Sequence, residues 1–412
     1  MKKFKKTLGL LLAVVMVSMA AFPATVAHAA GTMAFSVGTD YGGWFSVDTS
    51  SDATNARDLY AIAGYNSYSS TQPTVSIMRG NFTNGTKRIQ SDVLFFSGHG
   101  NYDNVAFNYD GKGGDYMTGV YYGSDLDSSS GYKYVGLYGN MSSVKLVTFA
   151  ACLTASNNDS NLAARAVSYG ADTSVGWSSS IAAGSHSNWL ARYNDKLATG
   201  STVLEAVTYA NSFTYLDSDV KDARIYGNRS LKIKLTAKAS LLEEEMALGN
   251  IAISSPFIEK VNNKITEATA ISAARANISN FDQTKYDVRI YEICDDCYTV
   301  DFVFTMDGVS TNSCYTMTVI DGKIAGIVDN TATFDEASLK ASIAKVALTS
   351  NTEVMNAARN ATNASKLKEA TTQEMMYYYD FETGSFQKVV FTEYQFDGTN
   401  AVGKDVHIVK AS

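Results

Sequence analysis

Short runs of consecutive apolar residues alternate with helix-like segments between residues 33 and 236. This alternation predicts an α/β fold in which a mainly parallel central sheet is flanked by helices. The clearest strands are Val93–Phe96 and Val144–Phe149. The first is apolar at successive positions, which is typical of a strand covered by helices on both faces.

Three segments of this domain have the spacing of helices. In Asn161–Tyr169 the apolar residues fall on one helical face, and Gly170 is suited to end the helix. A second helix is predicted over Asn188–Ala198. Thr202 and Glu205 form a capping-box pattern, which predicts that a third helix begins there.

A different pattern follows the first domain. Residues 237–256 have the composition of a helical linker, and beyond them two helical stretches, 257–278 and 334–368, are each followed by alternating strands. Asp-Gly and similar tight turns join these strands, which is a hairpin signal. The sequence therefore predicts a smaller α+β domain with an antiparallel sheet over residues 257–412, built from two halves of similar layout.

The chain begins with the layout of a secretory signal peptide. A head with four lysines, an apolar run from Leu8 to Ala21 and a small-residue exit at residues 27–30 follow one another. The apolar run is shorter than the ~20 residues of a membrane-spanning helix, and no later run is long and apolar enough to span a bilayer. We therefore expect removal of residues 1–30 and a secreted protein, extracellular or at the cell surface.

Length and charge narrow the classes of partner. Single hydrophobic cores usually stop growing at ~250 to 300 residues, so a chain of 412 residues is better divided into a first domain, 31–236, and a second one. Removing residues 1–30 takes away four lysines and no acids, which changes the formal charge from −7 to about −11. An acidic surface argues against nucleic acid or anionic lipid as the main partner.

Two strands of the first domain run into chemically reactive residues. Val93–Phe96 is followed by Ser-Gly-His99-Gly100, and Val144–Phe149 by Ala-Ala-Cys152. Ligands of parallel α/β sheets bind beyond the carboxyl ends of the strands, so these side chains can meet on one substrate. A thiolate attacks a carbonyl carbon, and an imidazole activates the thiol and protonates the leaving amine. The backbone amides of Gly100 and Cys152 are candidates for an oxyanion hole.

Each of these residues also has a structural interpretation. A cysteine at the end of a buried strand is usually a small core residue, and an isolated histidine is usually a hydrogen-bonded polar group. The shared strand-end position and the presence of a free thiol in an exported, cysteine-poor domain favour a Cys-His hydrolase. His186 competes with His99 as the base, but it lacks the strand-end setting and is expected to be a surface polar residue.

The same residues carry a resemblance to a known group. An apolar strand running into Ser97-Gly98-His99-Gly100, followed by another running into Ala151-Cys152, resembles the pattern of the caspase-like cysteine peptidases, which include caspases, legumains, gingipains and clostripain. The resemblance covers residues 33–236. It implies a caspase-like sandwich, cleavage of peptide bonds, His99 and Cys152 as catalytic residues, and no organic cofactor.

The resemblance also assigns substrate-binding positions. Gly170–Ser178 is similar to the strand and loop that hold the substrate backbone, with Trp177 in the place of a pocket-lining aromatic residue. The position two before the catalytic cysteine is Asp, Glu or Gln in the clostripain type, legumains and caspases, and here it is Ala150. Ser178 stands where caspases have a basic residue. A small or apolar specificity pocket follows, unless another side chain such as Asp172 reaches in.

Metal and disulfide sites are further alternatives. Asp125–Gly131 is a fragment of a calcium-loop pattern without its terminal glutamate, so no metal site is predicted, but calcium stays an open alternative. Cys294 and Cys297 with Cys314 look like half of a zinc site without a matching fourth ligand. In an oxidising exterior, a disulfide between Cys314 and one of the pair is favoured over free thiols.

The sequence therefore predicts a secreted cysteine endopeptidase that acts on proteins or peptides through a Cys152–His99 dyad. Two alternatives stay open: a non-catalytic surface or binding protein on the same scaffold, and a thiol transpeptidase that joins peptides. The second domain carries no catalytic constellation in its sequence. Its layout resembles appendages of secreted proteases that inhibit or target them, so intramolecular inhibition is one role it offers.

Overall fold

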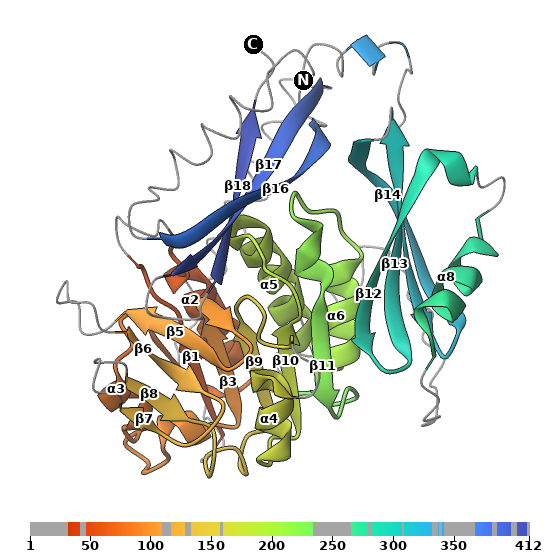
Figure 1. The fold of residues 1–412 in the computed structure, drawn as a ribbon. Helices are drawn as coiled ribbons and strands as arrows, with labels where there is room; N and C mark the ends of the chain where they lie inside the picture. Colours follow the sequence, from red (N-terminus) through yellow and green to blue (C-terminus); the bar gives the residue numbers. More distant parts are fainter. Residues whose placement is uncertain are drawn as a thin grey trace, which may run out of the picture. The chain divides into compact units, whose positions relative to one another are not determined.

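A six-stranded sheet in the order β11-β10-β9-β3-β1-β2 forms the centre of the first domain (Figure 1). Its strands are β1 (Met33–Val37), β2 (Asn66–Ser70), β3 (Val93–Ser97), β9 (Leu146–Ala150), β10 (Thr173–Trp177) and β11 (Ala223–Gly227). Neighbouring strands pair in parallel except β11, which runs antiparallel to β10 at the edge. The predicted mixed α/β fold with a mainly parallel sheet is confirmed at this level.

The computed structural model describes most of the chain after the first 31 residues. The described ranges are 32–41, 47–108, 117–127, 133–156, 160–233, 265–278, 282–306, 309–331, 367–380, 385–396 and 402–409, with residues 337, 340 and 341. The predicted signal peptide, the linker 237–256 and most of the helical stretch 334–368 lie outside them. In the described part, no helix is long and apolar enough to cross a membrane.

Helices cover both faces of the central sheet, and β3 shows how the two cores are divided. Side chains alternate between the faces of a strand, so Val93 and Phe95 enter one core and Leu94 and Phe96 the other. The helices on the first face are α2 (Ser50–Ile62), α5 (Ala183–Ala198) and α6 (Val203–Asn211), and those on the second are α3 (Val75–Arg79) and α4 (Leu162–Ser168).

The helix ends follow local sequence in two cases and tertiary contacts in a third. The Asn161 side chain accepts a hydrogen bond from the Ala164 N–H at the start of α4, and the predicted capping box opens α6. Helix α5 begins at Ala183, earlier than the predicted Asn188. The reason is non-local, because the Asp217 carboxylate accepts a hydrogen bond of 2.7 Å from the N–H of Ala182, the residue that caps α5.

A second sheet has eight strands in the order β16-β17-β18-β4-β5-β6-β8-β7. It combines two distant parts of the chain: β4 (His99–Asn101), β5 (Asn104–Asn108), β6 (Met117–Tyr121), β7 (Leu126–Asp127) and β8 (Lys133–Gly136) with β16 (Leu367–Asp380), β17 (Ser385–Phe396) and β18 (Val402–Val409). The two parts meet where Val402 pairs with Gly100 in antiparallel orientation. The C-terminal strand is thus attached next to His99.

A third sheet contains the antiparallel strands β12 (Tyr286–Cys294), β13 (Cys297–Met306), β14 (Val309–Ile320) and β15 (Lys323–Asn330). Helix α8 (Glu267–Arg275) packs on it, with Ala270 and Ala274 in one core with Phe302 and Met317. An antiparallel sheet with a helix agrees with the α+β character predicted for this region.

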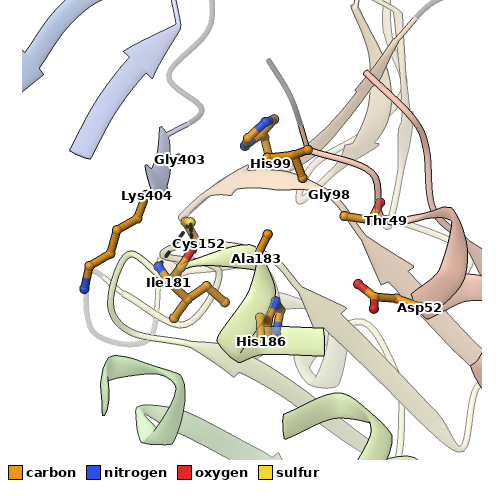
Figure 2. Close-up of a pocket in the computed structure, with 11 residues that line it drawn as sticks. Thr49, Asp52, Gly98, His99, Cys152, Ile181, Ala183, His186, Gly403 and Lys404 are labelled. Carbon is orange, nitrogen blue, oxygen red and sulfur yellow. Dashed lines mark hydrogen bonds between the residues drawn. The ribbon is translucent and has the colours of Figure 1, made fainter. Parts of the chain in front are cut away.

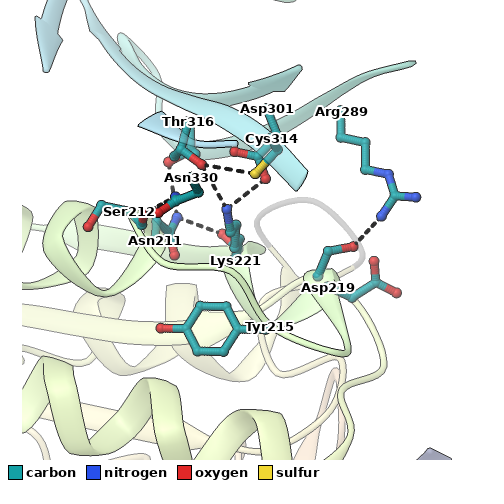
Figure 3. Close-up of polar contacts among 12 residues, drawn as sticks. Asn211, Ser212, Tyr215, Asp219, Lys221, Arg289, Asp301, Cys314, Thr316 and Asn330 are labelled. Carbon is teal, nitrogen blue, oxygen red and sulfur yellow. Dashed lines mark hydrogen bonds and ion pairs between the residues drawn. The ribbon is translucent and has the colours of Figure 1, made fainter. Parts of the chain in front are cut away.

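A buried ion pair connects the third sheet to the first domain (Figure 3). Lys221, in the short 3-10 helix η3 (Ser218–Lys221), places its Nζ 2.6 Å from Oδ2 of Asp301, and the two side chains are only 1% and 3% exposed. The Nζ also donates to Oγ1 of Thr316 at 3.3 Å. Residues 31–412 accordingly form one compact unit.

Candidate active site

Strands β3 and β9 bring the His99 loop and the Cys152 loop side by side. The strands pair in parallel with Ser97 opposite Ala150, so His99 and Cys152 each stand two residues beyond this pair. A Cβ on Gly100 would lie 2.6 Å from Cβ of Ala151 and 2.9 Å from the carbonyl oxygen of Cys152. Position 100 therefore has to be glycine for the two loops to approach this closely.

Tyr41 and β18 hold His99 in place. The backbone N–H of His99 donates to the Tyr41 hydroxyl at 2.7 Å, and the two rings lie 4.5 Å apart. The Tyr41 hydroxyl in turn donates to the carbonyl oxygen of Ala106. Burial lowers the pKa of His99 to about 3, although a hydrogen bond with the backbone of Val402 acts in the opposite direction. The imidazole is therefore neutral near pH 7 in this state.

The Cys152 thiol lies against the backbone of Ile181. Its Sγ accepts from the Ile181 N–H at 3.4 Å and donates to the Ile181 carbonyl oxygen at 3.6 Å. Burial raises the pKa of Cys152 to about 12, with the Ile181 backbone and the charge of Lys404 opposing the rise. The thiol is therefore protonated in this state. Leu153, which follows it, has a left-handed backbone with φ of 61°, so the chain turns sharply after Cys152.

His99 and Cys152 line the same pocket (Figure 2). The remaining lining residues are Val47, Thr49, Asp52, Gly98, Ile181, Ala183, His186, Gly403 and Lys404. Both His99 and Cys152 are only 4% exposed, and two residues of β18 contribute to the walls. The structure therefore describes a covered pocket, with the C-terminal strand as part of the cover.

Lys404 of β18 is bound by two carboxylates beside this pocket. Its Nζ lies 2.8 Å from Oδ1 of Asp217 and 2.7 Å from Oδ2 of Asp219. The Lys404 and Asp217 side chains are 5% and 1% exposed, whereas Asp219 is 36% exposed. Burial acts to lower the pKa of Lys404, but the two carboxylates outweigh it and raise that pKa, so the ammonium stays charged.

The residues expected to bind substrate lie outside the described pocket lining. Ala150 is fully buried in β9, and Trp177 is fully buried in β10, where its Nε1–H donates to the Val220 carbonyl oxygen at 2.8 Å. The Ser178 N–H donates to the carbonyl oxygen of Asp222. Asp172 precedes β10, at the end of the strand opposite to the pocket. The proposal that the backbone N–H groups of Gly100 and Cys152 form an oxyanion hole stays a prediction.

The expectation that His186 is a surface residue is wrong. It lies in the first turns of α5, is 5% exposed and packs edge-on against Trp177 with ring centroids 4.5 Å apart. It also lines the pocket that contains Cys152. Burial lowers the pKa of His186 to about 3, and its Nε2 has no hydrogen-bond partner among the described residues.

The predicted disulfide to Cys314 is also wrong, because the strand register separates the sulfurs. On the β13–β14 ladder Cys297 pairs with Ile320, whereas Cys314 pairs with Val303. Six residues of strand are about 20 Å, while the Cα atoms of a disulfide lie within about 7 Å of each other. All four cysteines are free, and Cys294 and Cys297 face each other as ladder partners with hydrogen-bonded side chains.

The calcium-like segment is only partly described. Asp125 accepts a hydrogen bond of 2.7 Å from the Gly136 N–H and forms an ion pair of 2.7 Å with Arg79, so its carboxylate already has partners. Residues 128–132 lie outside the described part. Within that part, no group of three or more His, Cys, Asp or Glu side chains is placed to hold a metal ion.

Sequence reasoning missed the residues that surround the dyad from distant parts of the chain. Folding brings Tyr41 to His99, which is 58 positions away in sequence, and brings Asp217 and Lys404 near Cys152, which is 65 and 252 positions away. None of the three residues carries a local motif. The acidic pair Asp217 and Asp219 is visible in the sequence, but its proximity to Cys152 depends on the contact between Asp217 and Ala182.

Comparison with known proteins adds little to this geometry. No protein-family model matches the chain, and no curated protein matches it. Among solved structures, it is similar to the Bacillus megaterium YpeB C-terminal domain, at 14% identity over 37% of this chain and 68% of that chain, with a TM-score of 0.20. A likeness at this TM-score supports no inference about fold or function, so the functional argument depends on the site itself.

Proposed function

We propose that this protein is a secreted cysteine endopeptidase of the caspase-like kind, with Cys152 as nucleophile and His99 as general acid and base. The observation that carries the proposal is that both side chains line one pocket at the carboxyl ends of two adjacent parallel strands. Parallel α/β sheets bind their ligands at this edge. The finer fold assignment, a caspase-like sandwich, is part of the same proposal.

The chemistry follows from the two groups. His99 takes the thiol proton, the Cys152 thiolate attacks the scissile carbonyl carbon, and the resulting imidazolium protonates the departing amine. The acyl-enzyme is then hydrolysed by a water molecule that His99 deprotonates. Backbone N–H groups of Gly100 and Cys152 would stabilise the negative charge on the carbonyl oxygen at both stages.

The covered state described above is not the reactive one. With the pKa of His99 lowered to about 3 and that of Cys152 raised to about 12, both groups are neutral and the thiol is a poor nucleophile. Exposure to water removes the burial that causes both shifts and brings both pKa values nearer to their ordinary range. The proposed reaction therefore requires β18 to leave the pocket.

The test compares two buried cysteines in the full-length chain. Purified protein is incubated for hours with a mixed peptide library and with a thiol-directed alkylating agent, alongside Cys152→Ala and Cys314→Ala. We expect Cys152→Ala to abolish peptide cleavage and the labelled active-site peptide, and Cys314→Ala to keep both. Peptide cleavage that survives Cys152→Ala at the wild-type rate would overturn the assignment, and so would the absence of cleavage from both the wild type and a folded Lys404→Gln chain, in which β18 loses its ion pairs beside the pocket.

One observation favours the non-catalytic alternative, namely the burial of both dyad residues. A scaffold that had lost catalysis could keep a covered pocket of this kind. The three candidate functions are distinguished by the products that each would form from a peptide. A binding protein gives no new peptide termini under any condition, an endopeptidase gives a free carboxylate, and a transpeptidase joins the acyl fragment to an added amine.

A further inference from the structure

We propose that β18 is an intramolecular inhibitor of this site and that Asp217 and Asp219 form the subsite for a basic side chain of the peptide substrate, a subsite that Lys404 occupies. This inference rests on the proposed peptidase function, whose site it completes. An acidic subsite differs from the small or apolar specificity pocket that the sequence predicts from Ala150.

The first support is the way in which β18 enters the site. It pairs with Gly100 through Val402, next to His99, and Lys404 forms an isolated bridge with Ala182, next to Ile181. An extended segment that adds to an exposed strand is a common way of binding a peptide, because its backbone supplies hydrogen bonds whatever its sequence. The segment Val402–Lys404 therefore reaches from Gly100 to Ala182, and Figure 2 shows its Gly403 and Lys404 near Cys152, where a bound peptide could lie.

The second support is the chemistry of the Lys404 contacts. A lysine ammonium that is 5% exposed and bonded at 2.8 Å and 2.7 Å to two carboxylates is bound as a ligand would be. Its Nζ also lies 4.6 Å from the centroid of the Phe391 ring in β17. The carboxylates come from the segment before η3 and from η3 itself, in the first domain, so the acidic subsite belongs to the domain that carries Cys152.

The third support is that Asp217 is fixed independently of Lys404. Its Oδ2 accepts from the Ala182 N–H at 2.7 Å, and its own N–H donates to Oγ of Ser185 at 3.0 Å. Both partners belong to the start of α5, and Ile181, which precedes them, holds the Cys152 thiol. A basic side chain bound to Asp217 therefore brings its own backbone close to Cys152, which is what a specificity subsite has to do.

Inhibition is tested without any substrate, by the rate at which Cys152 reacts with iodoacetamide in the full-length chain. In Lys404→Glu the new carboxylate faces Asp217 and Asp219, so like charges expel the strand. We expect alkylation at least tenfold faster than in the wild type. Lys323→Ala, which removes an exposed lysine at the start of β15, serves as the matched control and should react like the wild type. Equal rates in wild type and Lys404→Glu would overturn the inhibitory role.

Because Lys404→Glu places three carboxylates in a buried site, Lys404→Gln is measured in parallel as a variant with a neutral side chain of similar length. Circular dichroism and thermal unfolding establish that each protein is folded before its alkylation rate is compared. We expect Lys404→Gln to lie between wild type and Lys404→Glu. A folded Lys404→Gln with the wild-type alkylation rate counts against the inhibitory role as well.

The subsite is tested by the ratio of kcat/KM for two peptides that differ only in lysine or norleucine before the cut bond, a pair that keeps the shape and removes the charge. In the Lys404→Gln chain we expect lysine to be preferred at least tenfold. Asp217→Asn added to that chain should reduce the ratio at least fivefold, and Asp222→Asn, at a carboxylate that bonds to Ser179 and not to Lys404, should keep it. A ratio near one in the Lys404→Gln chain would overturn the basic subsite.

The two proposals fail in different ways. Faster alkylation of Cys152 in Lys404→Glu without cleavage of any peptide would mean that β18 covers a thiol that is not a peptidase nucleophile. Cleavage that depends on Cys152 but is indifferent to a basic residue would leave the peptidase standing and remove the acidic subsite.

Discussion

The Nζ of Lys404 and the Oδ1 of Asp217 lie 2.8 Å apart in the interior although 187 positions separate the two residues in sequence. The contact fixes the C-terminal strand to the first domain at one point beside Cys152. Removing one member of a buried ion pair leaves the other charge buried without a partner, and such changes lower the free energy of unfolding by about 3–5 kcal/mol. The stability of the chain and the closure of the pocket therefore depend on the same pair.

The first prediction concerns the energy of this pair. Lys404→Met and Asp217→Asn should each lower the free energy of unfolding by about 3–5 kcal/mol, and the double variant by less than the sum. Urea denaturation followed by fluorescence provides all four values of the cycle. Asp219→Asn is the comparison, because this carboxylate is 36% exposed and its loss should cost about 1 kcal/mol or less. Additive single changes would contradict the coupling.

The second prediction concerns the approach of the two loops at Gly100. In Gly100→Ala the new methyl group would meet Ala151 at 2.6 Å, so the loops must separate. We expect a loss of about 1–3 kcal/mol in stability, as for other overpacked sites, and a loss of peptide cleavage. Gly326→Ala is the control, because a Cβ at that position meets no atom within 4 Å. Wild-type activity in Gly100→Ala would mean that the loop approach is not needed.

The third prediction separates positioning of His99 from general packing. Tyr41→Phe removes the hydroxyl that accepts from the His99 N–H, so kcat should fall about tenfold while KM changes little, with a stability cost of about 1–3 kcal/mol. Tyr193→Phe removes another buried hydroxyl, which lies 3.3 Å from Oγ1 of Thr148 and away from the dyad. It should affect stability alone. Equal effects of both changes on kcat would mean that Tyr41 has no positioning role.

The fourth prediction concerns acid and the buried His186. Its pKa is lowered to about 3 in the folded chain, against 6.5 for an ordinary histidine, because burial disfavours the imidazolium. Between these two pH values the unfolded chain binds the proton and the folded chain does not, so stability falls as the pH falls from 6.5 toward 3. One histidine contributes a slope of up to about 1.4 kcal/mol per pH unit.

His186→Phe isolates this contribution, because the other titrating groups are the same in both proteins. The difference in unfolding free energy between variant and wild type should change in favour of the variant as the pH is lowered from 6.5 to 4. Urea denaturation at a series of pH values measures it. The same variant should keep peptide cleavage, whereas His99→Ala should lose it. A constant stability difference across the series would show that His186 is protonated in the folded chain too.

Local sequence was sufficient where the structure depends on neighbouring residues. The apolar runs of β3 and β9, the Asn161 cap and the Thr202–Glu205 capping box all express short-range physics, and the structure has each of them. That His99 and Cys152 lie at the same edge of the sheet was predictable for the same reason, because the end of a buried strand can be read from the strand itself. The start of α5 was missed because its cap contact comes from Asp217.

The remainder of the site depends on pairings between distant segments. Nothing near Lys404 in the sequence indicates that its ammonium binds Asp217, and nothing near Cys314 indicates that the β13–β14 register places it far from Cys297. Pairing of β18 with β4 connects residues 402 and 100, and no local periodicity reports such a contact. The expected small or apolar pocket was inferred from Ala150 and Ser178, and neither position indicates that Asp217 and Asp219 lie beside the pocket with Lys404.

The attachment of β18 to the same chain as Cys152 has a consequence for how the pocket opens. A tethered segment experiences a local concentration that the tether sets, which for short flexible connections is in the millimolar range. Dilution of the protein therefore does not release it, and each molecule closes its own site at any abundance. Lasting release would need cutting of the tether or a competitor that outbinds Lys404, so the onset of activity would be governed by events on single molecules rather than by the concentration of the protein.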